Sequence, residues 1–238
     1  MIPFLRTLAT LALLAGGLTV SASEGKAPGF REISFETADG ARIFANLYEG
    51  GNHAVVLAHG AVFNKESWDQ LAKELSADGL RVLAIDFRAY GKSTDGRESG
   101  ALHLDVLGAI KYLKAAGAKR VSLMGGSMGG GAVGEAATQV KPGEIDGLIL
   151  LAAAPVGNPE QLQGRKLFIV SEGDGSVTEV RDQFQRAKEP KKLVVLPGDA
   201  HAQHIFKTSQ SKALTSTIIN WLHEKSCRFS RRIILAPV

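Results

Sequence analysis

The sequence contains a single cysteine, Cys227, among its 238 residues. One cysteine cannot form a disulfide within the chain, so we expect the fold to depend on its hydrophobic core. Clusters of cysteine and histidine at metal-ligand spacing are also missing, and no set of acidic residues suggests a metal site. We therefore expect neither a metal ion nor an organic cofactor.

Neither sign of charge predominates in the sequence. The formal net charge is +4, and the densest basic cluster is Arg228, Arg231 and Arg232 near the C-terminus. Nucleic-acid binding would call for a long basic stripe or a recognised motif, and we find neither, so no nucleic acid is expected as a partner. We interpret these arginines as part of a solvated tail. The sequence leaves open whether residues 226–238 pack on the body, pair with a partner or stay disordered, and whether Cys227 meets another chain.

Long hydrophobic runs are limited to the N-terminus. Residues 8–18 form an apolar run after Arg6, and the small residues Val20-Ser21-Ala22 follow it. This pattern predicts a secretory signal peptide over residues 1–22, and the run is too short and glycine-rich for a comfortable membrane span. We expect an exported protein, periplasmic or secreted in a bacterium, without stable membrane insertion after cleavage. Residues 23–238 have the length of a single domain.

After the predicted signal peptide, the pattern of apolar and polar residues changes once along the chain. Residues 31–37 and 42–48 alternate apolar and polar residues around a short turn, which predicts a β-hairpin. From residue 54, near-continuous apolar segments alternate with amphipathic ones, as in a parallel sheet covered by helices on both faces. The predicted strands are 54–58, 80–85, 120–124, 147–152, 166–170 and 192–196, and the predicted helices are 66–77, 102–116, 127–139, 177–187 and 207–224. The segment between residues 152 and 166 is too short for a cap domain.

The most informative motif is Gly125-Gly126-Ser127-Met128-Gly129, between a predicted strand and a predicted helix. Gly125 and Gly129 let the backbone bend tightly without Cβ clashes, and the hydroxyl of Ser127 then stands clear of the strand. The start of a helix also favours a developing negative charge. The alternative is a glycine-rich turn that merely packs a helix closely on a sheet, because this pentapeptide also arises by chance.

A serine nucleophile needs a base to take its proton and an acid to orient that base. His201 lies in the loop after the last predicted strand, and we favour it as the base over His204. Asp174 directly follows another strand, and we favour it as the acid over Glu172 and Asp199. Asp174 could instead simply cap the helix behind it. The favoured residues all follow carboxyl ends of parallel strands, where such sheets bind ligands.

The predicted strand 54–58 ends in His59-Gly60, directly before a loop. Gly60 lets the backbone turn so that the N–H of Ala61 can point toward Ser127. The N–H of Met128 would be the second donor to an oxyanion. We expect His59 to fix this loop by hydrogen bonds rather than to act as a base.

In combination these motifs resemble the α/β-hydrolase superfamily, over residues 30–223. The motifs are the elbow Gly125–Gly129, His59-Gly60, Asp86-x-Arg88-x-x-Gly91-x-Ser93, Gly173-Asp174 and Gly198-x-x-His201. The resemblance implies a mostly parallel central sheet, an N-terminal antiparallel hairpin and no cap domain. It also implies a Ser127–His201–Asp174 triad and an acyl-enzyme intermediate. One departure is Ala89-Tyr90, where relatives often have a glycine directly after the arginine.

The expected activity is cleavage of small-molecule carboxylic esters with short or accessible acyl groups, because no lid would cover the serine. An amidase, peptidase or acyltransferase with the same triad remains an alternative. So does a non-catalytic binding protein on a hydrolase-like fold, since fold does not dictate function. Nucleotide binding is disfavoured, because the phosphate-loop signature and a ribose-binding acid after the turn are both missing.

Overall fold

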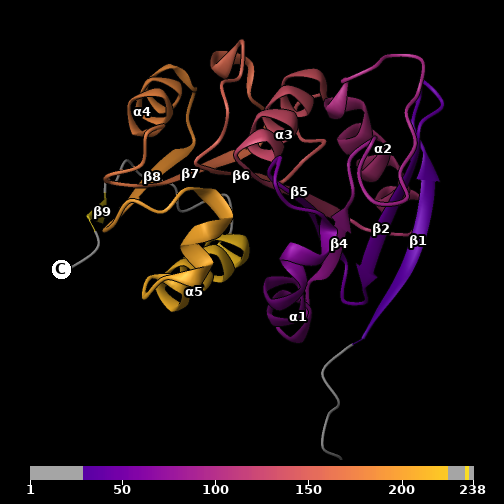
Figure 1. Cartoon of the computed structure of the whole chain (residues 1–238), viewed down its shortest axis with the longest axis horizontal. Helices are drawn as coiled ribbons and strands as arrows, with labels where there is room; N and C mark the ends of the chain where they lie inside the picture. Colours follow the sequence, from indigo (N-terminus) through magenta and orange to yellow (C-terminus); the bar gives the residue numbers. More distant parts are fainter. Residues whose placement is uncertain (1–28, 225–233, 236–238) are drawn as a thin grey trace, which may run out of the picture.

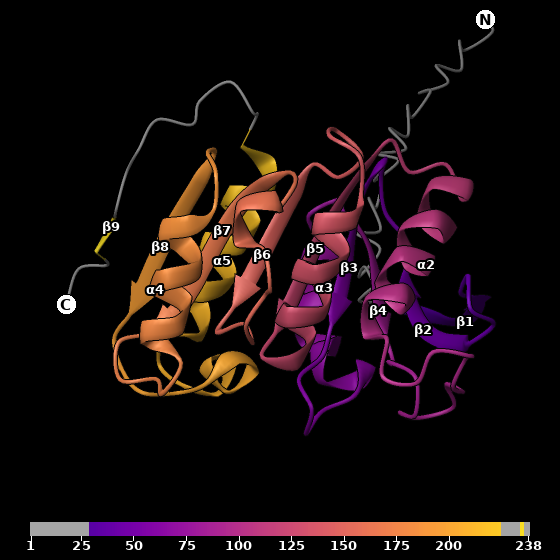
Figure 2. The ribbon, with the colours of Figure 1, turned by 90° about the horizontal axis from the view of Figure 1, so that it is seen from above.

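A nine-stranded sheet organises the part of the chain that the computed structural model describes, residues 29–224 and the backbone of Ile234–Leu235. The strand order is β1-β2-β4-β3-β5-β6-β7-β8-β9 (Figures 1 and 2). The predicted signal peptide and most of the predicted tail lie outside the described residues.

The sheet combines an antiparallel edge with a parallel centre. β1 and β2 form the predicted hairpin, β2 also pairs antiparallel with β4, and the other neighbouring strands run parallel. The bounds are β1 Phe30–Glu36, β2 Arg42–Tyr48, β3 His53–Ala58, β4 Arg81–Ile85, β5 Arg120–Gly126, β6 Gly147–Leu151, β7 Arg165–Ser171, β8 Lys191–Leu196 and β9 Ile234–Leu235. The predicted fold class is confirmed, and the backbone of β9 adds a strand that the sequence left open.

Helices cover both faces of the sheet. Helices α2 (Leu102–Ala115), α3 (Met128–Gln139) and α4 (Val177–Arg186) lie on one face, and α1 (Asp69–Ala77) and α5 (Ser211–His223) lie on the other (Figures 1 and 2). Each face has its own hydrophobic core. Successive strand residues alternate between the two cores, as Val55 and Val56 do on β3, which is why the strands are apolar throughout.

Two predicted helices are wrong in their extent. The helix predicted over 207–224 begins only at Ser211, as α5, because Lys207 ends a separate 3₁₀ helix, η3 (Ala202–Lys207). Between them Thr208 is extended, and its hydroxyl donates to the carbonyl of Ile205 (2.8 Å) and accepts the N–H of Gln210 (3.1 Å). Such local bonds compete with the helical ladder. The helix predicted from residue 66 likewise begins as a 3₁₀ turn, η1 (Lys65–Trp68).

The segment between β6 and β7 is short, as predicted. Its regular structure consists of one 3₁₀ turn, η2 (Pro159–Gln161). No cap domain is therefore present over this part of the described chain.

A buried ion-pair network holds the loop after β4. Arg88 is 2% exposed and donates to Asp39 (2.8 Å), Asp105 (2.7 Å) and the carbonyl of Glu98 (2.5 Å). The hydrogen bond from Arg88 keeps the pKa of Asp39 well below its usual range. The next residue, Ala89, has φ +61°, in the left-handed region that favours glycine. The network thus stabilises a backbone conformation at Ala89 that a glycine would adopt more easily.

The substitution Arg88→Met is expected to lower the free energy of unfolding by about 3–5 kcal/mol, because it leaves two buried carboxylates without their partner. Urea unfolding measures the loss. The exposed pair of Arg186 with Glu160 (3.2 Å) provides the control, and Arg186→Met should cost about 1 kcal/mol or less. A comparable loss in both variants would contradict the structural role of Arg88.

Candidate active site

The turn from β5 into α3 holds Ser127 in a strained backbone conformation, with φ +52° and ψ −118°. Its N–H donates to the carbonyl of Leu151 (3.0 Å), and its carbonyl accepts the N–H of Ala154 (2.9 Å). A Cβ at Gly125 would overlap the backbone of Gly129. The surrounding contacts therefore maintain a conformation that costs an isolated serine about 1–3 kcal/mol.

His201 connects Ser127 to a buried carboxylate. The Oγ of Ser127 lies 2.8 Å from Nε2 of His201, while Nδ1 of His201 lies 2.8 Å from Oδ2 of Asp174. Asp174 is 3% exposed, and Ser127 is half-buried. With the imidazole proton on Nδ1, the serine hydroxyl donates to His201 and His201 donates to Asp174. This arrangement can remove the hydroxyl proton and stabilise the imidazolium that results.

Neighbouring side chains hold the acid and the base in position. The backbone N–H and the hydroxyl of Ser176 donate to Oδ1 of Asp174, at 2.8 and 2.9 Å. The hydroxyl of Ser171 donates to the carbonyl of Ala200 (2.7 Å), directly before His201. Asp174 therefore stabilises the turn before α4 and also contacts the histidine, so it does more than cap a helix.

The structure separates the favoured residues from their competitors. The ring of His204 lies 5.0 Å from the ring of Phe63 and is exposed, whereas His201 contacts the serine. Glu172 and Asp199 are exposed, and neither donates to or accepts from His201. Of the candidates for base and acid, the structure brings His201 and Asp174 to Ser127.

The turn after β3 lies beside the serine. A Cβ at Gly60 would be 3.5 Å from the Cβ of Ser127. The N–H of Ala61 makes no hydrogen bond with any described residue, and the N–H of Met128, first in α3, has no acceptor within its helix. Two backbone donors therefore remain available on the two segments that flank the serine.

His59 fixes this turn. Its ring is fully buried, Nε2 accepts the N–H of Phe87 (3.3 Å), and Nδ1 therefore carries the proton and donates to the carbonyl of Gly60 (2.9 Å). Burial lowers the pKa of His59, which favours the neutral ring. His59 contacts the loop in the way expected of a positioning residue.

Sequence reasoning missed two further residues, Gln203 and Tyr90. Oε1 of Gln203 accepts the N–H of Gly60 (2.7 Å), and its Nε2 donates to the hydroxyl of Ser67 (2.6 Å). The hydroxyl of Tyr90 donates to the carbonyl of Ala61 (3.1 Å). No motif marks Gln203, because its partners are more than 130 positions away in the sequence. Tyr90 lies in the segment that departs from the pattern of relatives, which is the one signal that could have identified it.

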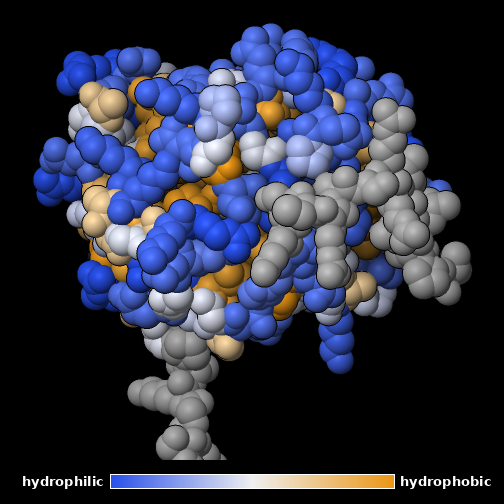
Figure 3. All heavy atoms as spheres, turned by 180° about the vertical axis from the view of Figure 1, so that it is seen from behind, coloured by the Kyte–Doolittle hydropathy of each residue, from blue (hydrophilic) through white to orange (hydrophobic). Residues whose placement is uncertain are grey.

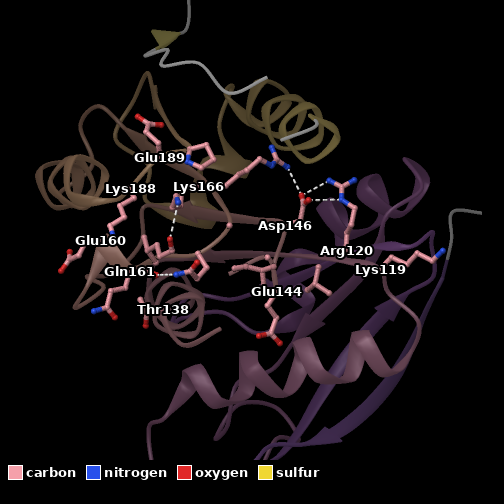
Figure 4. Close-up of a pocket in the computed structure, with 18 residues that line it drawn as sticks. Lys119, Arg120, Thr138, Glu144, Asp146, Glu160, Gln161, Lys166, Lys188 and Glu189 are labelled. Atoms are coloured by element: carbon pink, nitrogen blue, oxygen red, sulfur yellow. Dashed lines mark hydrogen bonds and ion pairs between the residues drawn. The ribbon is translucent and has the colours of Figure 1, made fainter. Parts of the chain in front are cut away.

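A separate hollow of about 720 Å³ lies at the amino ends of β5 to β8 (Figure 4). Asp146 there binds both Arg120 (2.8 Å) and Arg165 (3.0 Å). Lys166 is 2% exposed and donates to the carbonyl of Leu162 (3.4 Å), and burial lowers the pKa of its ammonium group to about 8. The hollow contains no histidine and no arrangement like that around Ser127.

Among the described residues, no three histidine, cysteine or carboxylate side chains are placed to hold a metal ion. No helix in the described ranges is both long and apolar enough to cross a membrane. Seen from behind, the surface is mostly hydrophilic, with small hydrophobic patches between the polar side chains (Figure 3).

Comparison with known proteins identifies the fold family. The sequence model of the alpha/beta hydrolase fold family matches residues 53–172. A non-heme chloroperoxidase of Streptomyces lividans is 28% identical over 155 residues, which cover 63% of this chain and 52% of that protein. A bifunctional esterase/perhydrolase of Acinetobacter calcoaceticus is 30% identical over 123 residues, covering 50% and 44% respectively. The chain thus spans about half the length of the curated relatives that it matches.

Solved structures share the fold at low identity. An esterase from Pyrococcus furiosus superposes with a TM-score of 0.71 at 21% identity, covering 82% of this chain and 92% of that one. A dienelactone hydrolase from Anabaena variabilis gives a TM-score of 0.69 at 22% identity, with coverages of 82% and 97%. The chain belongs to the alpha/beta hydrolase fold family, as its motifs predicted.

The pKa of Lys166 yields a prediction about stability. Because its pKa of about 8 in the folded protein lies below the ordinary lysine value, the unfolded chain binds more protons from about pH 8 to 10, and stability rises with pH there. The cost of burying the charge is therefore largest below pH 8. Lys166→Met is expected to raise Tm by about 2–4 °C at pH 7 and by less at pH 10.

Differential scanning calorimetry at both pH values measures this difference. Lys119→Met is the control, because Lys119 lies at the same hollow but is exposed, and it should leave Tm nearly unchanged. An equal effect of Lys166→Met at both pH values would contradict a lowered pKa.

Proposed function

We propose that this protein is a serine hydrolase that cleaves small-molecule carboxylic esters through an acyl-enzyme intermediate. The observation that carries the proposal is the continuous hydrogen-bonded chain Ser127–His201–Asp174 beside two backbone N–H donors. An isolated serine is a weak nucleophile, and this arrangement supplies both its base and the group that orients the base.

In the proposed mechanism, Oγ of Ser127 attacks the ester carbonyl carbon while Nε2 of His201 accepts the hydroxyl proton. Asp174 stabilises the imidazolium, and the N–H groups of Ala61 and Met128 bind the oxyanion. When the carbon–oxygen ester bond breaks, His201 protonates the departing alkoxide, and the acyl group stays on Ser127. Water then loses a proton to His201 and attacks the acyl carbon. The bond to Oγ of Ser127 breaks, the acid leaves, and His201 returns the proton to Oγ.

The short segment between β6 and β7 supports small or accessible acyl groups as substrates. Over these residues the chain forms one 3₁₀ turn rather than a lid. A small acyl group needs no deep covered pocket to approach Ser127. Export through the predicted signal peptide of residues 1–22 would place such an esterase in the periplasm or medium.

Relatives favour a second candidate, perhydrolysis. The curated relatives include a non-heme chloroperoxidase and a bifunctional esterase/perhydrolase, both at 30% identity or below. Hydrogen peroxide would take the place of water in the second half of the same mechanism and yield a peracid. Product analysis with ester and peroxide together distinguishes the two, since peracid forms in one case and carboxylic acid alone in the other.

Labelling with a fluorophosphonate tests the activated serine. The wild-type protein should be labelled at Ser127, and Ser127→Ala and His201→Ala should both abolish the label and lower kcat for ester hydrolysis by about 10⁴-fold or more. Peptide mass spectrometry locates the label, and nitrophenyl acetate hydrolysis measures kcat.

His204→Ala is the matched control, because His204 is a nearby histidine that contacts Phe63 instead of the serine. It should keep both the label and the activity. Labelling that depends on His204 would reassign the base, while an unlabelled wild-type protein would favour a non-catalytic binding protein.

Gln203 is expected to position the turn after β3, which carries the N–H of Ala61. Gln203→Ala removes the acceptor of the Gly60 N–H, and we expect kcat to fall about 10-fold to 100-fold with little change in KM, because oxyanion contacts are made in the transition state. Gln185→Ala, an exposed glutamine on α4, is the control. A rise in KM at constant kcat would argue against this role.

A further inference from the structure

A pocket of about 410 Å³ lies between α1 and α5, within the size range of small-ligand sites. Polar side chains in its lining include Ser67, Gln70 and Thr215. Its hydrophobic walls are Phe63, Trp68, Leu71 and Phe206. The rings of Trp68 and Phe206 meet edge to face, with their centroids 6.0 Å apart. None of the described residues that line this pocket is acidic, and one of them, Lys207, is basic. The pocket thus suits an uncharged apolar group better than a cation.

Two aromatic residues of the lining, Phe63 and Phe206, follow the proposed catalytic segments closely in the sequence. Phe63 follows the turn after β3, and its N–H donates to the carbonyl of Gly60 (3.0 Å). Phe206 follows the base, since η3 begins directly after His201. Gln203 lines the pocket and contacts Gly60, so one side chain borders both the pocket and the turn beside the serine.

We propose that this pocket receives the alcohol group of the ester substrate, so that the preferred substrates combine a small acyl group with an apolar alcohol of aromatic size. This inference rests on the proposed esterase function. The departing oxygen has to lie within hydrogen-bond reach of His201, which places the alcohol on the side of the base. Gln203 and Phe206 line the pocket and belong to η3, the turn that directly follows His201.

The proposal predicts a graded preference among acetate esters. As the alcohol grows from methyl to butyl to benzyl, kcat/KM should rise at least tenfold, mainly through a lower KM. Burial of the alcohol group stabilises the bound substrate and the transition state alike, so kcat should change little.

A substitution that fills the pocket tests its role. Ser211 is half-buried at the start of α5 and lines the pocket. Ser211→Phe should lower the ratio of kcat/KM for benzyl acetate to that for methyl acetate at least tenfold. Ala213→Phe places the same ring on an exposed position of the same helix, outside the pocket, and should keep the wild-type ratio.

Circular dichroism checks that Ser211→Phe folds, and a second variant keeps the test decisive if it does not. Phe206→Ala removes an aromatic ring from the lining and introduces no larger side chain. It should raise KM for benzyl acetate several-fold. An unchanged ratio in both folded pocket variants would overturn the proposal. So would a pocket-dependent preference for the length of the acyl chain, which would place the acyl group there. Failure of the esterase function itself is distinguished by an unlabelled Ser127 and no turnover of any acetate.

Discussion

The backbone conformation of Ser127 is the constraint on which the site depends. A serine with φ +52° at the end of a strand is unfavourable on its own. A side chain on Gly125 would overlap the backbone of Gly129, and one on Gly129 would overlap the end of β3. The glycines allow α3 to begin immediately after the serine. As a result the hydroxyl, the first N–H of the helix and the carboxyl ends of the neighbouring strands meet at one edge of the sheet.

Hydrogen bonds from distant parts of the chain then complete the site. The loops after β7 and β8 supply Asp174 and His201, and the turn after β3 contributes its free N–H. His59 and Gln203 hold this turn from opposite directions, one through the carbonyl of Gly60 and the other through its N–H. The proposed chemistry therefore needs the parallel sheet to align four loops that are far apart in the sequence.

Most of the fold and the central residues of the site could be predicted from sequence, because their signals are local. Apolar runs revealed the parallel strands, and the glycine pattern around Ser127 marked the turn. The ends of helices were harder to predict, since the local hydrogen bonds of Thr208 delay the start of the last helix to Ser211. Gln203 could not be found at all, because its role depends on two contacts that exist only after the chain has folded.

The proposed hydrolysis requires Ser127 to carry the acyl group during turnover. Rapid mixing with nitrophenyl acetate, acid quenching within the first turnover and peptide mass spectrometry would measure this directly. We expect a burst of nitrophenol that approaches one equivalent per chain, with one acetyl group on the peptide that contains Ser127. Steady hydrolysis without a burst and with Ser127 unmodified would contradict it.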